Sequence, residues 1–140
     1  MSEEESWRAK VECTEVLHRF YAGLDGGRPD DVANLMAPDG VWLRQGAHLK
    51  GPDAVRSALE ERSPSIVSAH LVCNAVVDLQ GSDEALLSAW ILVFRSTSAD
   101  GGPPAAAPHV VMQCRDRMVR TTQGWRFAHK RATVAFRATH

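Results

Sequence analysis

Four long runs of β-type residues follow one another through the second half of the sequence, and they limit the possible folds more than any other feature. The runs are rich in valine, isoleucine, leucine and aromatic residues, which favour extended backbone. Tight connections join two pairs of runs, and a Pro- and Gly-rich segment at 97–108 separates the pairs. Together these features predict a meander of antiparallel strands. The runs cover about residues 65–80, 84–96, 109–121 and 124–137.

The first half of the sequence has helical periodicity instead. Apolar residues at three- and four-residue spacings predict a helix over about residues 4–24. Shorter helices are expected within 27–37 and over about 52–62, on either side of a short strand at 41–45. Helices followed by a strand meander predict an α+β fold with the helices on one side of the sheet. The predicted buried face of the first helix contains Trp7, Val11, Thr14, Leu17, Tyr21 and Leu24.

The composition is that of a single globular domain spanning residues 1–140. Of the 140 residues, 44% are hydrophobic and 24% are charged, which suffices for a stable core without cross-links. The net charge is −1 and no basic stripe is found, so we expect no nucleic-acid partner. The acidic N-terminus and the lack of a long apolar run predict a cytoplasmic protein that does not enter the membrane.

The cysteine and histidine residues form no metal-binding pattern. The three cysteines, Cys13, Cys73 and Cys114, are odd in number and widely spaced, which fits neither a zinc site nor a disulfide framework. Free thiols fit a reducing compartment. We therefore expect neither a metal ion nor another cofactor.

Asp25 occupies an unusual place, the C-terminal end of the first predicted helix. Gly26 and Gly27 follow it and end the helix. A carboxylate there meets the negative end of the helix dipole, which costs about 0.3–1 kcal/mol. Asp25 is therefore either an exposed turn residue or a residue that serves a partner. A histidine would be such a partner, because a carboxylate orients an imidazole and stabilises its charged form.

His70 lies on a predicted strand with two different faces. One face is entirely apolar and is expected to be buried; the other is mixed, as in a solvated face or the wall of a ligand cavity. His70 is a candidate general base, because histidine titrates near neutral pH. The apolar face carries Leu71, Cys73, Ala75, Val77 and Leu79, and the mixed face carries His70, Val72, Asn74, Val76 and Asp78.

Four segments resemble, in their order and spacing, the SnoaL-like branch of the nuclear transport factor 2-like superfamily. They are "RFYAGLDGGRPDDVANLMAPDGVW", "LKGPDAV", "AHLVCNAVVDLQG" and "RDRMVRTTQGWRFAHKR". The resemblance covers nearly the whole chain. It implies a cone-shaped α+β barrel, in which three N-terminal helices pack on a curved, mainly antiparallel sheet. Because this fold hosts many activities, function has to be argued from the site.

Some enzymes of this superfamily pair an aspartate that ends the first helix with a histidine that opens a long strand. Scytalone dehydratase, the bile acid dehydratases and hexachlorocyclohexane dehydrochlorinase are such enzymes. Their histidine removes a proton from a substrate carbon, and the aspartate orients the histidine. Asp25 and His70 lie at the matching positions. Trp42 matches a pocket tryptophan of the dehydrochlorinase, and Asn74 matches its HxxxN spacing.

The sequence also departs from these enzymes. It has Phe20 where the dehydrochlorinase has a lysine, and Lys130 where that enzyme has an arginine. Tyr21 is the only tyrosine, whereas scytalone dehydratase uses two. By resemblance, we expect Tyr21, Trp42, Asn74 and Lys130 to orient the substrate or to stabilise developing negative charge.

The resemblance thus implies a cofactor-independent lyase or isomerase with Asp25 and His70 as its catalytic residues. Its ligand would be a small, largely apolar ring compound held in an enclosed pocket, and the reaction would be dehydration, dehydrohalogenation or isomerisation. A polyketide cyclase, a hydrophobic-ligand-binding protein and an assembly subunit like the β subunit of ring-hydroxylating dioxygenases remain open alternatives. Members of this superfamily commonly associate through the sheet, so a homodimer or homotrimer is expected. The substrate and the roles of segment 97–108 and His109 remain open.

Overall fold

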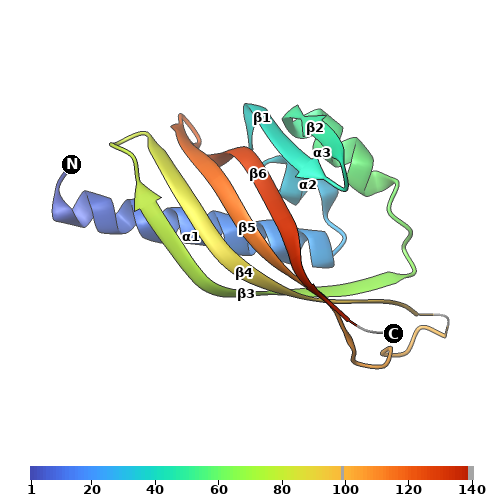
Figure 1. Cartoon of the computed structure of the whole chain (residues 1–140). Coiled ribbons are helices and arrows are strands. Elements are labelled where there is room, and N and C mark those ends of the chain that lie inside the picture. Colours follow the sequence, from blue (N-terminus) through green and yellow to red (C-terminus); the bar gives the residue numbers. More distant parts are fainter. Residues whose placement is uncertain (99, 139–140) are drawn as a thin grey trace.

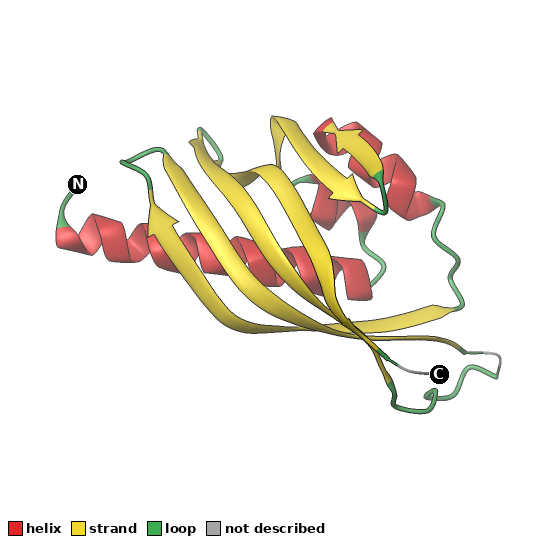
Figure 2. Ribbon diagram, viewed as in Figure 1, coloured by secondary structure: helices red, strands yellow, loops and turns green. Residues whose placement is uncertain are grey.

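Six strands form one curved sheet, and three helices pack against one of its faces (Figures 1 and 2). The computed structural model describes residues 1–98 and 100–138. The strand order is β2-β1-β6-β5-β4-β3, and only the β1–β6 pair is parallel. The helices are α1 Glu3–Asp25, α2 Pro29–Ala33 and α3 Gly51–Glu60. The strands are β1 Met36–Arg44, β2 Ala47–Lys50, β3 Ile66–Leu79, β4 Glu84–Thr97, β5 Pro108–Thr121 and β6 Gly124–Arg137.

This architecture confirms the predicted α+β fold with a curved, mainly antiparallel sheet. The sheet is open, with β2 and β3 as its two edges. The prediction differs around β1, which begins at Met36 and contains the "PDG" segment expected to be a turn. The pairing of β1 with β6 is irregular there, and a Cβ at Gly40 would collide with the backbone oxygen of Phe127. The four residues of β2 were not predicted, because they lack an alternating apolar pattern.

Helix α1 begins with the capping box formed by Ser2 and Glu5. Its buried face begins in the second turn, at Ala9, and continues through Cys13, Leu17 and Phe20. Trp7 and Val11, predicted to be buried, are 69% and 46% exposed. Each lies two positions from the buried Ala9, which places it on the opposite side of the helix. The first turns of α1 also extend past the edge of the sheet (Figure 1).

Strand β3 reverses its buried face part-way along, which corrects the predicted pattern. Leu71 is 48% exposed and Cys73 is also exposed, whereas Val77 is buried. Cys73 pairs with Trp90 and Val76 with Ser88, so two residues of β3 lie opposite one residue of β4. This is a β-bulge, and its extra residue exchanges the two faces of the strand. His70 and Val72 therefore face the helices, and Leu71 and Cys73 face outward.

The core lies between the helices and the inner face of the sheet. Each fully buried large side chain in it stabilises the fold by about 1.5–3 kcal/mol relative to exposure. The largest of these are Trp125, Phe20, Phe127, Leu17, Leu87 and Ile91. None of the helices in the described part of the chain is long and apolar enough to cross a membrane.

Candidate active site

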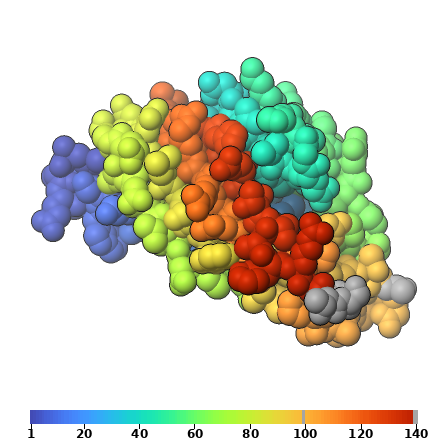
Figure 3. Space-filling model, in the orientation of Figure 1, coloured from blue at the N-terminus to red at the C-terminus, as the bar shows by residue number. Residues whose placement is uncertain are grey.

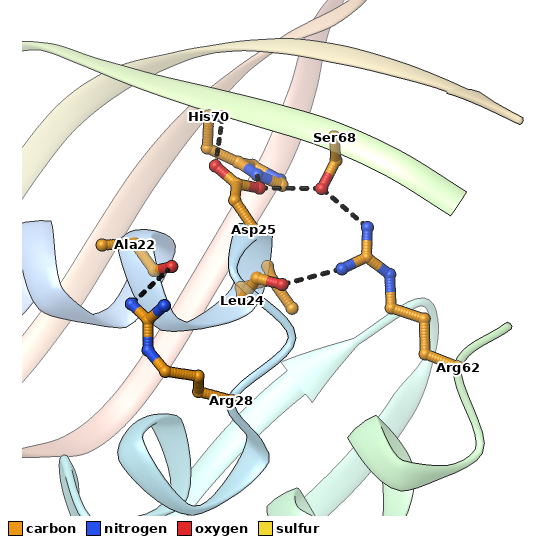
Figure 4. A network of polar contacts seen from close by, with 7 residues as sticks. All are labelled: Ala22, Leu24, Asp25, Arg28, Arg62, Ser68 and His70. Atoms are coloured by element: carbon orange, nitrogen blue, oxygen red, sulfur yellow. Dashed lines mark hydrogen bonds and ion pairs between the residues drawn. The ribbon is translucent and has the colours of Figure 1, made fainter. Parts of the chain in front are cut away.

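The carboxylate of Asp25, at the end of α1, is bound by three groups of strand β3 (Figure 4). Its Oδ1 lies 2.6 Å from Nδ1 of His70, and it also accepts a hydrogen bond from the Ser68 hydroxyl at 2.7 Å. Its Oδ2 accepts the backbone N–H of His70 at 2.7 Å. The helix terminus and the strand are thus joined at this carboxylate, and the imidazole ring is held in one orientation.

These contacts determine which atoms carry the proton between Asp25 and His70. Burial by itself raises the pKa of Asp25, but the hydrogen bonds from His70 and Ser68 outweigh burial and leave the pKa below its ordinary value of 3.8. An ionised carboxylate can only accept hydrogen bonds. Nδ1 of His70 therefore carries the proton that is donated to Asp25, so in the neutral imidazole the lone pair lies on Nε2. This is the tautomer that a general base requires.

Two arginines offset the negative charge at the end of α1. Arg28 donates to the carbonyl of Ala22 at 3.1 Å, and Arg62 donates to the carbonyl of Leu24 at 2.8 Å. Carbonyls in the last turn of a helix lack partners within the helix. Arginine side chains that bind them also counter the dipole that disfavours Asp25 there.

His70 lines a pocket of about 230 Å³ between the end of α1 and the inner face of the sheet. The buried side chains of Tyr21, Trp42 and Val93 form its floor. Its outer part is lined by the more accessible arginines Arg44, Arg62 and Arg95. The pocket thus has an apolar and aromatic interior and a cationic entrance.

Tyr21 supports the imidazole and lines the same pocket. Its ring stacks on that of His70, with centroids 4.9 Å apart and planes at 19°. Its oxygen accepts a hydrogen bond from Nζ of Lys130 at 3.1 Å. Burial raises the pKa of Tyr21, so the hydroxyl stays protonated at neutral pH. Within the described residues no acceptor for the Tyr21 proton is found.

Comparison with known proteins assigns the chain to a family. The model of the SnoaL-like domain matches residues 5–131. The chain belongs to the SnoaL-like family. No protein with a curated function matches the sequence.

Several solved structures share the SnoaL-like fold. A scytalone dehydratase-like protein from Novosphingobium aromaticivorans is 16% identical, with a TM-score of 0.84 over 99% of this chain and 92% of that chain. A type 2 hexachlorocyclohexane dehydrochlorinase is 13% identical, with a TM-score of 0.84 over 98% and 92% of the two chains. An NTF2-like protein with a cystatin-like fold, also from N. aromaticivorans, is 24% identical, with a TM-score of 0.80 over 92% and 83%. At these identities the likeness shows the fold.

Four of the six site residues predicted for this SnoaL-like chain meet at the pocket or directly beside it. Tyr21, Trp42 and His70 line it, and Asp25 holds His70. Asn74 does not join them. It is exposed, and it lies in the β3 bulge with a φ of 55°, outside the pocket lining.

Lys130 lies beneath the pocket and does not line it. Its side chain is 1% exposed, and Nζ lies 3.0 Å from Oδ2 of the equally buried Asp116. Burial alone would lower the pKa of Lys130, but the charge of Asp116 outweighs burial and raises it. The ammonium group therefore stays charged and bonds to the Tyr21 oxygen from below, so it contacts the site through Tyr21.

The cationic entrance of the pocket was not predicted from the sequence. Arg44 ends β1, Arg62 follows α3 and Arg95 lies near the end of β4, so no local spacing relates them. His109, whose place was left open, lies at the same entrance. Among the residues that the structure describes, no group of three histidine, cysteine, aspartate or glutamate side chains could hold a metal ion.

Proposed function

We propose that this SnoaL-like protein is a cofactor-independent enzyme in which His70 removes a proton from a carbon atom of a small ring compound. The reaction would be an elimination, by a dehydratase or dehydrohalogenase, or an isomerisation. The observation that carries the proposal is the 2.6 Å contact between Asp25 and Nδ1 of His70, beside a pocket that His70 lines. The similar folds of a scytalone dehydratase-like protein and a dehydrochlorinase support the same class of chemistry.

In this proposal His70 and Asp25 act as one unit. Nε2 takes the substrate proton while the electrons of the C–H bond form a new double bond and the leaving group departs with its own electron pair. Asp25 stabilises the imidazolium that results. For a leaving hydroxide, the imidazolium can return the proton and release water. A general base of this kind contributes about 10²–10⁴-fold to the rate.

Tyr21 is proposed to stabilise the charge that develops on the substrate. Its hydroxyl donates to a leaving oxygen or to an enolate oxygen, and Lys130 increases its donor strength by bonding to the phenol oxygen at 3.1 Å. Hydrogen-bond donors aimed at developing charge inside a dry pocket are among the strongest contributions to catalysis. Trp42 bounds the ligand space as an apolar wall.

A substrate screen with hydroxylated and halogenated rings, followed by variants, tests the proposal. For a ring that the wild type converts, His70→Ala is expected to lower kcat by at least about 100-fold, because the base is lost. His48→Ala is the matched control, since His48 is exposed on β2 outside the pocket lining. Circular dichroism checks that both variants fold. Unchanged turnover in folded His70→Ala would contradict the base assignment, and cyclised products in the screen would favour a polyketide cyclase.

A non-catalytic role is the second candidate, favoured by the outer face of the sheet. This face is not covered by a helix (Figure 3). It would serve self-association as a homodimer or homotrimer, or docking as an assembly subunit. A protein that binds apolar rings in the pocket without converting any of them would support this candidate. The large apolar side chains of the outer face include Leu71, Val76, Leu86, Trp90 and Phe136.

A further inference from the structure

Three arginines from separate parts of the chain converge at the entrance of the His70 pocket. Arg44, Arg62 and Arg95 all line it. Among the described residues, no aspartate or glutamate side chain lines this pocket. The nearest carboxylate, that of Asp25, already binds His70 and Ser68. The entrance therefore carries a strong local positive charge, although the whole chain has a net charge of −1.

The three guanidinium groups lie close enough to repel one another. Burial, followed by the charges of Arg62 and Arg95, lowers the pKa of Arg44. Burial and the charge of Arg95 likewise lower the pKa of Arg62. Like charges held together at a partly buried site disfavour the fold unless an anion binds between them. Such a cost is common where a site has been built for a ligand.

The arginines also have unused hydrogen-bond donors. Within residues 1–98 and 100–138, neither Arg44 nor Arg95 forms an ion pair, and Arg44 lies over the Trp42 ring at 5.2 Å. Arg62 is held in place by the Leu24 carbonyl and, at 2.6 Å, by the Ser68 hydroxyl. Arg62 is therefore held in place at one side of the entrance, and the other two arginines have donors left for a ligand.

We propose that the substrate of this pocket carries a carboxylate, which binds at Arg44, Arg62 and Arg95 while its ring lies on Tyr21 and Trp42. The fork of a guanidinium group matches the two oxygens of a carboxylate. The pocket volume of about 230 Å³ suits one substituted ring, since a cavity of roughly 150 Å³ holds benzene. The carboxylate proposal rests on the proposed elimination or isomerisation. Together they limit the substrates to cyclic carboxylic acids that also carry a hydroxyl or halide leaving group, or a carbonyl.

The proposal is tested by calorimetric titration with benzoate and with benzamide, its neutral counterpart of the same shape. Wild type is expected to bind benzoate more tightly, and added sodium chloride is expected to weaken benzoate binding alone. Arg44→Gln and Arg95→Gln should each weaken benzoate binding by at least about tenfold and leave benzamide binding unchanged. Arg115→Gln is the control, because Arg115 is exposed and lies outside the pocket lining.

The outcomes separate this proposal from the catalytic one. His70→Ala is expected to keep the preference for benzoate even though its turnover is lost. Turnover that survives in His70→Ala would contradict the base assignment while leaving the carboxylate site intact. Equal binding of benzoate and benzamide, absence of benzoate binding, or unchanged binding in both arginine variants would overturn the carboxylate site. A clear preference for phenyl phosphate over benzoate would overturn the choice of carboxylate.

Discussion

Asp25 shows how a single side chain can connect the end of a helix to a strand 45 positions later in the chain. Its carboxylate is disfavoured by the helix dipole, and three hydrogen bonds from Ser68 and His70 reverse that preference. The same bonds set the tautomer of His70. Asp25, although unfavourable at a helix end, was the best local indication of the site, because functional residues often occupy positions that local preferences disfavour.

Asp25 is predicted to make the stability of the fold depend on pH. Its folded pKa lies below the ordinary value of 3.8, so its contribution is fully present above that value and is lost as the pH falls through the folded pKa. Asp25→Asn should therefore be less stable than wild type at neutral pH, and the difference in free energy of unfolding should shrink below about pH 4. Urea denaturation at several pH values measures this.

Asp78→Asn is the matched control for that experiment, because Asp78 is exposed and lies on β3, the strand that Asp25 contacts. Asp78→Asn should change the pH dependence of the free energy of unfolding little. A difference between wild type and Asp25→Asn that stays constant down to pH 2 would contradict the assigned direction of the pKa shift.

At the scale of elements, the β3 bulge decides which side chains enter the pocket. Before the bulge, the even-numbered residues His70 and Val72 face the helices; after it, the odd-numbered Val77 does so. The bulge cannot be recognised in the sequence, because apolar residues alternate without interruption along the odd-numbered positions of β3. The prediction therefore placed Leu71 and Cys73 in the core, although both are exposed.

The backbone of the bulge yields a stability prediction for Asn74. Its φ of 55° lies in the left-handed region, which glycine adopts freely and asparagine tolerates, whereas a β-branched residue does not. Asn74→Val is expected to be less stable than Asn74→Gly by about 1–2 kcal/mol, as measured by urea denaturation.

Leu71 offers a control on the same strand, at an exposed position with regular pairing to Leu92. There the order should reverse, with Leu71→Val more stable than Leu71→Gly. An Asn74→Val protein at least as stable as Asn74→Gly would show that the left-handed residue is absent in solution.

At the scale of the whole molecule, the open sheet leaves its outer face without a covering layer. Part of this face is apolar, and another part carries charged side chains such as Asp78, Arg115 and Arg117. Phe136 is 63% exposed and lies beside Trp90, with ring centroids 6.2 Å apart. Contiguous apolar patches on soluble proteins commonly mark interaction sites. The expected homodimer or homotrimer would bury this face.

The oligomer prediction is tested by the mass of the protein in solution. Light scattering of the wild type is expected to give two or three times the monomer mass, and Phe136→Lys should shift it toward the monomer, because a charge there would be buried in the interface. Trp7→Lys is the control, since Trp7 is 69% exposed on α1, away from the outer face. A monomeric wild type, or an oligomer that Phe136→Lys leaves unchanged, would contradict an interface at this face.

Periodicity and turn residues are local properties of the chain, so they predicted the three helices, the four long strands, their order and the α+β class, although they missed β2. The sequence also marked Asp25 and His70, through an unfavourable helix end and a strand with a mixed face. The contacts between residues far apart in the sequence could be seen only in the tertiary structure. In the folded protein, Lys130 lies against Asp116 beneath Tyr21, and Asn74 lies outside the pocket. Arg44, Arg62 and Arg95 meet at the entrance of the pocket. Such juxtapositions depend on sheet order and on one inserted residue in β3, and neither is encoded in the spacing of the residues concerned.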